Sequence, residues 1–157
     1  MSKPRLLPYR QSLAGSLLLA REAVMAPLRG HLRQAGVTEQ QWRVLRVLAE
    51  HDHLDPSSLA SLALLHAPSV TRILRELEER MLIERGADAA DRRRSITRLT
   101  PGGRALVDAT AERTTNILTH YETLFGAERL GRLRSELIAL AETIRAAEVE
   151  AAHAPNR

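Results

Sequence analysis

Apolar residues recur at intervals of three and four positions along most of the chain, which predicts a mainly helical protein. The first series predicts a long amphipathic helix over residues 12–34. Pro27 lies inside this segment and is expected to kink or split the helix, because proline has no N–H to donate to the preceding turn. Gly36 is expected to end it.

Three shorter helices are expected next. Thr38 and Gln41 have the spacing of a capping box, which predicts the start of a helix that runs to about Glu50. An Asp-Pro pair opens a helix over residues 55–64, and Pro68 opens another. The apolar face expected for this last helix consists of Val70, Ile73, Leu74, Leu77 and Met81. Short helices with short connections are typical of a helix-turn-helix unit.

The apolar period changes to two after Leu82, which predicts short strands over residues 83–85 and 95–99. The segment between them, residues 86–94, is a charged loop. Two strands that follow three helices predict a winged helix-turn-helix, and the Thr100-Pro101 pair is expected to cap the next helix.

The rest of the chain predicts two further helices, over residues 104–125 and from Ala127 onward, separated at Gly126. The second carries apolar residues at alternating steps of three and four, the spacing of a coiled-coil seam. We call these residues the seam: Leu130, Leu133, Leu137, Leu140 and Ile144. A chain of 157 residues has little core left to cover the seam, which favours a homodimer interface. Packing against residues 13–32 of the same chain is the alternative.

The predicted fold class is therefore mainly α with a small β-wing. We divide the chain by expected role into an N-terminal dimerisation helix (residues 1–36), a winged helix-turn-helix (37–100) and C-terminal dimerisation helices (101–157).

Composition removes several classes of function. The chain has no cysteine, which excludes disulfides, zinc-thiolate sites and thiol chemistry, and no cofactor is expected. Four aromatic residues are too few for the stacking platforms of single-strand nucleic-acid binders. Uninterrupted apolar runs are short, so neither a membrane span nor a secretory signal is expected, and we expect a cytoplasmic protein.

The net charge of +4 is unevenly distributed. Residues 66–104 hold nine arginines and six acids, whereas residues 105–156 hold five arginines and eight acids. A basic middle segment indicates that this part of the chain faces a polyanion, although ordinary solvated helix faces are the alternative.

The expected third helix of the helix-turn-helix carries hydroxyl and guanidinium groups near its N-terminus, which suits base and phosphate contacts in the major groove of DNA. The wing adds three successive cations, and an arginine can enter a narrow minor groove. The DNA contacts predicted from the sequence are Pro68, Ser69, Val70, Thr71, Arg72, Arg75, Asp91, Arg92, Arg93 and Arg94. The alternatives are ion pairs of Arg72 and Arg75 with Glu76 and Glu79, and a solvated surface turn in place of the wing contact.

Two other functions are alternatives to a sequence-specific DNA-binding protein. His51, Asp52 and His53 suggest a metal-dependent enzyme, but no further ligand stands at helical spacing, so a polar turn is the favoured interpretation. The sequence also contains neither a phosphate-binding loop nor a His-Glu-x-x-His motif, which disfavours an enzyme. A sequence-independent architectural DNA binder is the other alternative, although such proteins tend to be more basic.

The order of elements and the wing sequence resemble the multiple-antibiotic-resistance regulator (MarR) family of bacterial transcription factors over about residues 10–150. The wing segment Asp91–Gly103 is similar to the family's Asp-Arg-Arg followed by Leu-Thr-x-x-Gly, with Ala90 in place of a frequent arginine. The resemblance implies that Arg93 enters the minor groove, and we expect Asp91 to hold the wing arginines through carboxylate–guanidinium hydrogen bonds.

Within the family, residues 19–23, 32–50 and 67–74 most resemble the homoprotocatechuate-degradation operon repressors. This resemblance implies a DNA-bound repressor that hydroxyphenylacetate-type acids release, so the expected partners are a double-stranded pseudo-palindromic operator, a second copy of the chain and a small aromatic carboxylic acid. The candidate effector-binding residues are Arg21, Trp42, Arg46 and His66. Alternatives for the first two are a salt bridge for Arg21 and a core position for Trp42.

Overall fold

The computed structural model describes residues 6–88, 91 and 93–153. They form a mainly helical protein with one small antiparallel sheet, as the sequence predicts. The elements are a short 3-10 helix η1 (Tyr9–Gln11), α1 (Leu13–Gln34), α2 (Glu39–Ala49), α3 (Pro56–Leu62), α4 (Ala67–Glu79), β1 (Ile83–Ala87), β2 (Ser95–Leu99), α5 (Pro101–Phe125) and α6 (Ala127–His153). The chain divides into two compact units, Met1–Thr115 and Asn116–Arg157, which are described separately. The division by role into residues 1–36, 37–100 and 101–157 stays a prediction.

Polar side chains cap α2 and α3 at the predicted places. The Thr38 hydroxyl accepts a hydrogen bond from the Gln41 N–H, and the Gln41 side chain accepts one from the Thr38 N–H, which completes the capping box. Asp55 caps α3 by accepting bonds from the N–H groups of Ser57 and Ser58. These local interactions explain why the helix starts were predictable from residue types alone.

Pro27 does not split α1, which was one of its two expected effects. The helix continues from Leu13 to Gln34, and the turn after the proline buries Leu28 and Leu32. The free energy gained by burying these two side chains offsets the cost of the hydrogen bond that Pro27 cannot donate.

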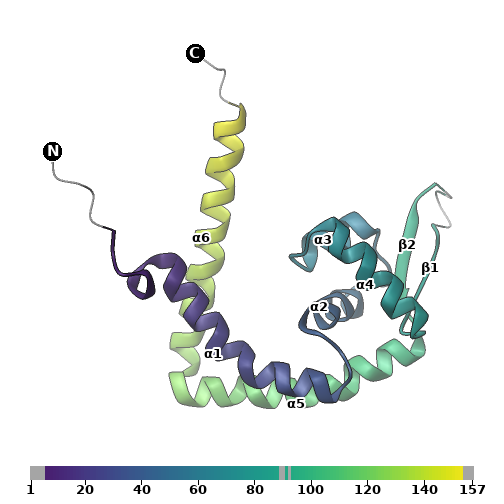
Figure 1. Cartoon of the computed structure of the whole chain (residues 1–157), viewed down its shortest axis with the longest axis horizontal. Helices are drawn as coiled ribbons and strands as arrows, with labels where there is room; N and C mark the ends of the chain where they lie inside the picture. The colour runs from purple at the N-terminus through teal and green to yellow at the C-terminus, as the bar shows by residue number, and fades with distance from the viewer. Residues whose placement is uncertain (1–5, 89–90, 92, 154–157) are drawn as a thin grey trace. The chain divides into compact units, whose positions relative to one another are not determined.

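The three helices of the helix-turn-helix and the wing pack together in the first unit (Figure 1). The strands pair antiparallel, with Ile83 opposite Leu99 and Ala87 opposite Ser95, so β1 is two residues longer than predicted. Leu54 adds a backbone bridge to Thr97, which ties the segment before α3 to β2 on the side away from β1. The wing is thereby anchored to the helices at its base.

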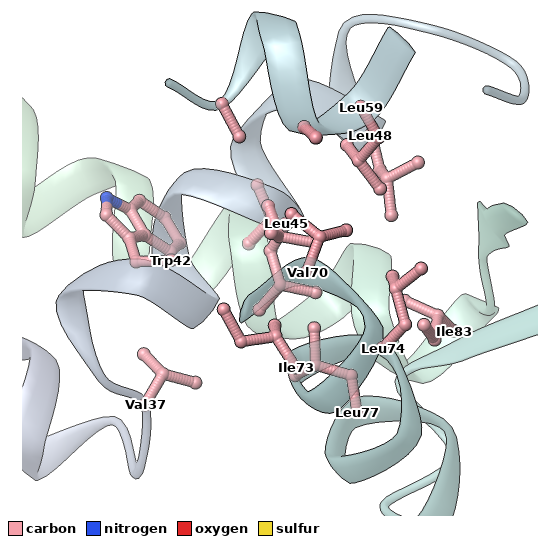
Figure 2. Close-up of a cluster of buried hydrophobic side chains, with 14 of the residues drawn as sticks. Val37, Trp42, Leu45, Leu48, Leu59, Val70, Ile73, Leu74, Leu77 and Ile83 are labelled. Carbon is pink, nitrogen blue, oxygen red and sulfur yellow. The ribbon is translucent and has the colours of Figure 1, made fainter. Parts of the chain in front are cut away.

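One apolar cluster joins α2, α3, α4 and β1 (Figure 2). Leu45, Leu48, Leu59, Leu74 and Leu77 are at most 1% exposed at its centre. We expected Met81 on the apolar face of α4, and this expectation is wrong. Helix α4 ends at Glu79, after which Met81 adopts a φ of +55° and is 78% exposed. The positive φ at Met81 lets the chain change direction and enter β1, whose first residue, Ile83, is buried in place of Met81.

The second unit holds the C-terminal part of α5 and the whole of α6, with Gly126 at a φ of +91° between them. Three seam residues, Leu133, Leu137 and Ile144, are 42%, 39% and 47% exposed. An α-helix with exposed leucines at coiled-coil spacing has an apolar face that a single chain leaves in contact with water. Among the described residues, no helix has both the length and the apolar character needed to span a membrane.

Candidate nucleic-acid interface

Helix α4 divides into a buried side and an open side. Val70, Ile73, Leu74 and Leu77 are 0–2% exposed and hold the helix on the core. Thr71, Arg72 and Arg75 are exposed on the other side. Val70 was also predicted to contact DNA, but its side chain is 1% exposed and packs in the cluster of Figure 2, so only its backbone remains for such a contact.

The N-terminal end of α4 lies one residue earlier than predicted, with His66 as the capping residue and Pro68 in the first turn. Pro68 is exposed, and Ser69 is half-buried with its N–H bonded to the His66 carbonyl at 3.0 Å. Arg43 of α2 fixes the turn before this end, because its guanidinium donates to the carbonyls of Ala63 and Leu64 at 3.2 and 3.1 Å. Leu64 adopts a φ of +54°, so α3 ends at Leu62, earlier than predicted.

The two arginines on the open side of α4 form ion pairs along the helix, as the alternative interpretation expected. Arg72 lies 3.7 Å from Glu76, and Arg75 lies 3.8 Å from Glu79. Both arginines remain 67–68% exposed despite these pairs. Exposed pairs of this kind are weak, so the guanidinium groups are available to another anion.

Arg85 of β1 joins this surface, which the sequence interpretation missed. It lines a surface hollow of about 270 Å³ together with Pro68, Thr71, Arg72 and Arg75. Its guanidinium also bonds to Glu78 of α4. Strand alternation places Arg85 on the same face as the buried Ile83, so the sequence did not single it out, and the packing of β1 against α4 brings it beside the helix.

Asp91 shapes the wing turn through backbone contacts. Its carboxylate accepts a hydrogen bond from the Arg93 N–H at 3.0 Å, and the Arg94 N–H donates to the Asp91 carbonyl at 2.9 Å. This contact differs from the expected carboxylate–guanidinium pairing. The Arg93 side chain is exposed, whereas Arg92 lies outside the described residues.

Arg94 lies against acidic groups at the base of the wing. It lines a hollow of about 130 Å³ with Asp55 and Asp88, and His53 lies on the same rim. The pKa of Asp55 is lowered, chiefly because the Ser58 hydroxyl and N–H donate to its carboxylate, with smaller effects from the Ser57 N–H and the charge of Arg94. Carboxylates therefore surround part of the positive charge of Arg94, which distinguishes it from Arg93.

The His51-Asp52-His53 segment is exposed and follows the end of α2. Within the part of the chain that the structure describes, no three His, Cys, Asp or Glu side chains are grouped so that they could hold a metal ion. The metal-enzyme hypothesis therefore gains no structural support.

Comparison with known proteins shows which family the chain belongs to. The sequence profile of the MarR family matches residues 35–94, which span α2 to the wing. The HTH-type transcriptional regulator FarR of Neisseria gonorrhoeae is 38% identical over 126 residues, covering 80% of this chain and 86% of FarR. This chain belongs to the MarR family. The homoprotocatechuate degradative operon repressor of Escherichia coli is 36% identical over 132 residues, covering 82% of this chain and 89% of the repressor.

Solved structures agree with this membership and with the winged-helix fold. The crystal structure of NadR in complex with 4-hydroxyphenylacetate superposes with a TM-score of 0.76 at 36% identity, covering 87% of this chain and 97% of NadR. The transcriptional regulator PA4135 has a TM-score of 0.78 at 34% identity, covering 85% of this chain and 98% of that protein. The protein is therefore a transcriptional regulator of the MarR family.

The four candidate effector residues of this MarR-family regulator occupy different surroundings. Arg21 pairs with Glu22 and Glu39, as its alternative interpretation expected. Trp42 is 6% exposed in the core cluster, and Figure 2 shows its nitrogen turned away from Leu45. Arg46 lies 3.9 Å from Glu50, and His66 is exposed at the start of α4.

A second hollow of about 230 Å³ lies between α4 and the start of α2, and Arg21 is the one candidate of the four that lines it. The other lining residues come from α4 and from the start of α2: Thr38, Glu39, Gln40, Arg43, Arg72, Ile73 and Glu76. Arg29 of α1 bonds to Glu22 of the same helix at 2.6 Å. It also lies 3.8 Å from Glu39 of α2, which adds a second charged contact between the two helices. The hydrogen bond from Arg29 lowers the pKa of Glu22, and the pKa of Arg29 is raised in turn.

Proposed function

We propose that this MarR-family regulator is a repressor that binds a pseudo-palindromic DNA operator as a homodimer and is released by a small aromatic acid of the hydroxyphenylacetate type. The observation that carries the proposal is the open side of α4, where Thr71, Arg72 and Arg75 lie exposed beside Arg85 of the wing. A rigid helix with hydroxyl and guanidinium groups on its outer side fits the major groove.

In the proposed complex, α4 lies in the major groove and the wing lies over the adjacent minor groove. Arg93 enters the minor groove, because its side chain is exposed and Asp91 orders the backbone beneath it. Arg94 contributes less to DNA binding, because Asp55 and Asp88 lie beside it. Pro68 and Ser69 place the N-terminal end of α4, with its positive helix dipole, near a phosphate.

The homodimer proposal rests on the seam of α6. Its exposed leucines match the a and d spacing with which helices of two chains interdigitate. A two-fold dimer presents its two recognition helices about one DNA turn apart, roughly 34 Å, so each half-site of a pseudo-palindrome meets the same protein surface.

The effector proposal rests on the relatives. NadR was crystallised with 4-hydroxyphenylacetate, and the E. coli relative is the repressor of a homoprotocatechuate degradative operon. Arginine pairs with a carboxylate through two parallel hydrogen bonds, which suits Arg21 or Arg46, and an indole such as Trp42 packs well against an aromatic ring. An acid releases DNA only if it binds the DNA-free conformation more tightly than the DNA-bound one.

Replacing Arg93 with alanine is expected to weaken operator binding and to flatten its salt dependence. Loss of one cation that neutralises phosphate charge from within the groove reduces the slope of log K against log salt by up to about 0.9. The measurement is a fluorescence-anisotropy titration of a duplex selected by the purified protein from a random-sequence pool, repeated at several salt concentrations. Arg33→Ala, which removes an exposed arginine from the end of α1, is the control. An unchanged affinity and slope for Arg93→Ala would remove Arg93 from the interface.

Adding 4-hydroxyphenylacetate or 3,4-dihydroxyphenylacetate is expected to release the protein from the selected duplex. A gel-shift series measures the release, and thermal unfolding without DNA measures binding of the acid, because a ligand that binds the native state raises its stability. The matched control ligand is 4-hydroxybenzyl alcohol, which keeps the phenol and lacks the carboxylate. Retention of the DNA complex at every concentration of both acids would contradict the proposed effector class.

Competition with random DNA separates sequence-specific regulation from the architectural alternative. A sequence-specific regulator prefers its selected duplex by at least about 1,000-fold at fixed salt, whereas an architectural binder shows little preference.

A further inference from the structure

Two arginines on the open side of α4 have similar exposure and the same spacing to a glutamate, yet their glutamates differ. Arg72 faces Glu76, which is 38% exposed, and Arg75 faces Glu79, which is 68% exposed. The difference comes from α2, because Gln41 donates a hydrogen bond to the Glu76 carboxylate at 3.0 Å. Within the described residues, no comparable contact from another element holds Glu79.

Gln41 is a rigid anchor for this contact. It is 7% exposed, and its side-chain oxygen accepts the Thr38 N–H at 3.0 Å as part of the capping box. This contact sets the orientation of the amide, since only the oxygen can accept from an N–H. The amide nitrogen must then point to Glu76, where it lies 3.0 Å from one carboxylate oxygen.

The other oxygen of Glu76 lies 3.7 Å from the Arg72 Nε. An exposed ion pair contributes little on a free helix, because both long side chains lose rotamer freedom when they pair. The Gln41 contact has already restricted Glu76, so Arg72 meets an acceptor that is in place. Arg75 meets a glutamate that must still be ordered.

From this difference we infer that Gln41 and Glu76 are positioning residues that make Arg72, rather than Arg75, the arginine that distinguishes one base pair from another. The inference rests on the proposed DNA-binding function. Recognition of a guanine requires a guanidinium with a defined direction, whereas a phosphate accepts hydrogen bonds from many directions. Arg72 therefore contributes sequence discrimination, and Arg75 contributes affinity for DNA of any sequence.

The test compares two variants that make the same chemical change on the same helix, Glu76→Gln and Glu79→Gln. Arg72→Ala first identifies the base pair at which discrimination depends on Arg72, using the selected duplex and its single-base-pair variants at fixed salt. We expect Glu76→Gln to lower discrimination at that base pair by about fivefold to tenfold, out of the tenfold or more that a well-placed arginine provides. We expect the discrimination of Glu79→Gln at that base pair to stay within about twofold of that of the unchanged protein.

Overall affinity serves as an internal check in both variants. Each removes one negative charge near DNA phosphates, so both should bind random DNA more tightly and to a similar degree. Only discrimination should separate them.

Gln41→Glu supplies a second arm that keeps the capping box, since glutamate serves at this position as well as glutamine. It removes the donor to Glu76 and places two carboxylates together, so discrimination at the same base pair should fall. Combining Gln41→Glu with Glu76→Gln restores a hydrogen bond between the two positions, with the amide N–H at position 76 as the donor, so that a neutral amide oxygen replaces the carboxylate oxygen facing Arg72. We expect the combination to recover the thermal stability and only part of the discrimination, because a neutral acceptor holds a guanidinium less firmly than a carboxylate does.

Equal effects of Glu76→Gln and Glu79→Gln on discrimination would overturn the inference. Full recovery of discrimination in the combined variant would do the same, because the carboxylate of Glu76 would then not be the group that holds Arg72. Either result leaves the proposed function intact if the unchanged protein still prefers its selected duplex. Absence of any preference over random DNA in the unchanged protein would remove the proposed function, and this inference with it.

Discussion

Replacing Leu137 with glutamate is expected to separate the proposed dimer into monomers and to weaken binding to the selected duplex by at least about 100-fold. Leu137 lies in the middle of the seam and is 39% exposed in the single chain. A two-fold interface would bury the new carboxylate twice, and each uncompensated buried charge costs about 3–5 kcal/mol. A monomer holds one half-site and loses the gain from simultaneous contact with both.

Sedimentation equilibrium measures the change in mass, and anisotropy with full-site and half-site duplexes measures the change in binding. Ala139→Glu is the matched control, because it adds the same side chain to an exposed position on the opposite side of α6. Helix content by circular dichroism should be the same in both variants. A Leu137→Glu protein that sediments as a dimer would show that the seam is not the interface.

Replacing Gly103 with alanine is expected to lower the free energy of unfolding by about 2–3 kcal/mol, the upper part of the range for overpacking. A Cβ atom at this position would overlap the Leu82 carbonyl oxygen and lie 3.1 Å from the Leu99 side chain. Neither a backbone oxygen nor a packed leucine can move without disturbing the wing. The Gly103 N–H also donates to the Thr100 hydroxyl at 3.0 Å, so a shift of the backbone would weaken the cap of α5.

Gly102→Ala is the control, since its added Cβ would meet its nearest atom, the Met81 carbonyl oxygen, at 3.6 Å. Alanine is the better helix former by roughly 1 kcal/mol, so this variant should be at least as stable as the unchanged protein. Urea unfolding followed by circular dichroism measures both. Similar midpoints for the two variants would show that α5 can start without the close approach at Gly103.

Much of the fold was predictable, because local interactions specify it. Thr38 with Gln41 and Asp55 with the following serines cap their helices through residues three positions apart or closer, and such contacts form wherever those residue types occur in that order. The apolar spacing within α4 likewise identified its buried residues correctly up to Leu77. The error at Met81 arose because the chain leaves the helix through a positive φ that no residue type in this segment indicates.

The candidate site was predictable only in part. Residue types and the family motif led to Arg72, Arg75 and Arg93, all of which are exposed in the structure. Arg85 was missed because the packing of β1 against α4 joins elements through a long-range contact that periodicity does not report. Val70 was predicted as a DNA contact, yet the period of α4 places it on the apolar face, where its side chain is buried.

The sequence by itself determined the order of the elements, the capping of the helices, the charged wing and the exposed seam of α6. Each depends on side chains and backbone groups a few residues apart, whose interactions are set by covalent spacing. Only the tertiary structure decided that Gln41 of α2 anchors Glu76 of α4, and that Asp55 lies beside Arg94. These contacts join positions 35 and 39 residues apart, and such distances close only when the apolar core has brought the helices together. Two arginines that look equivalent in the sequence, Arg72 and Arg75, become different in the folded protein for this reason.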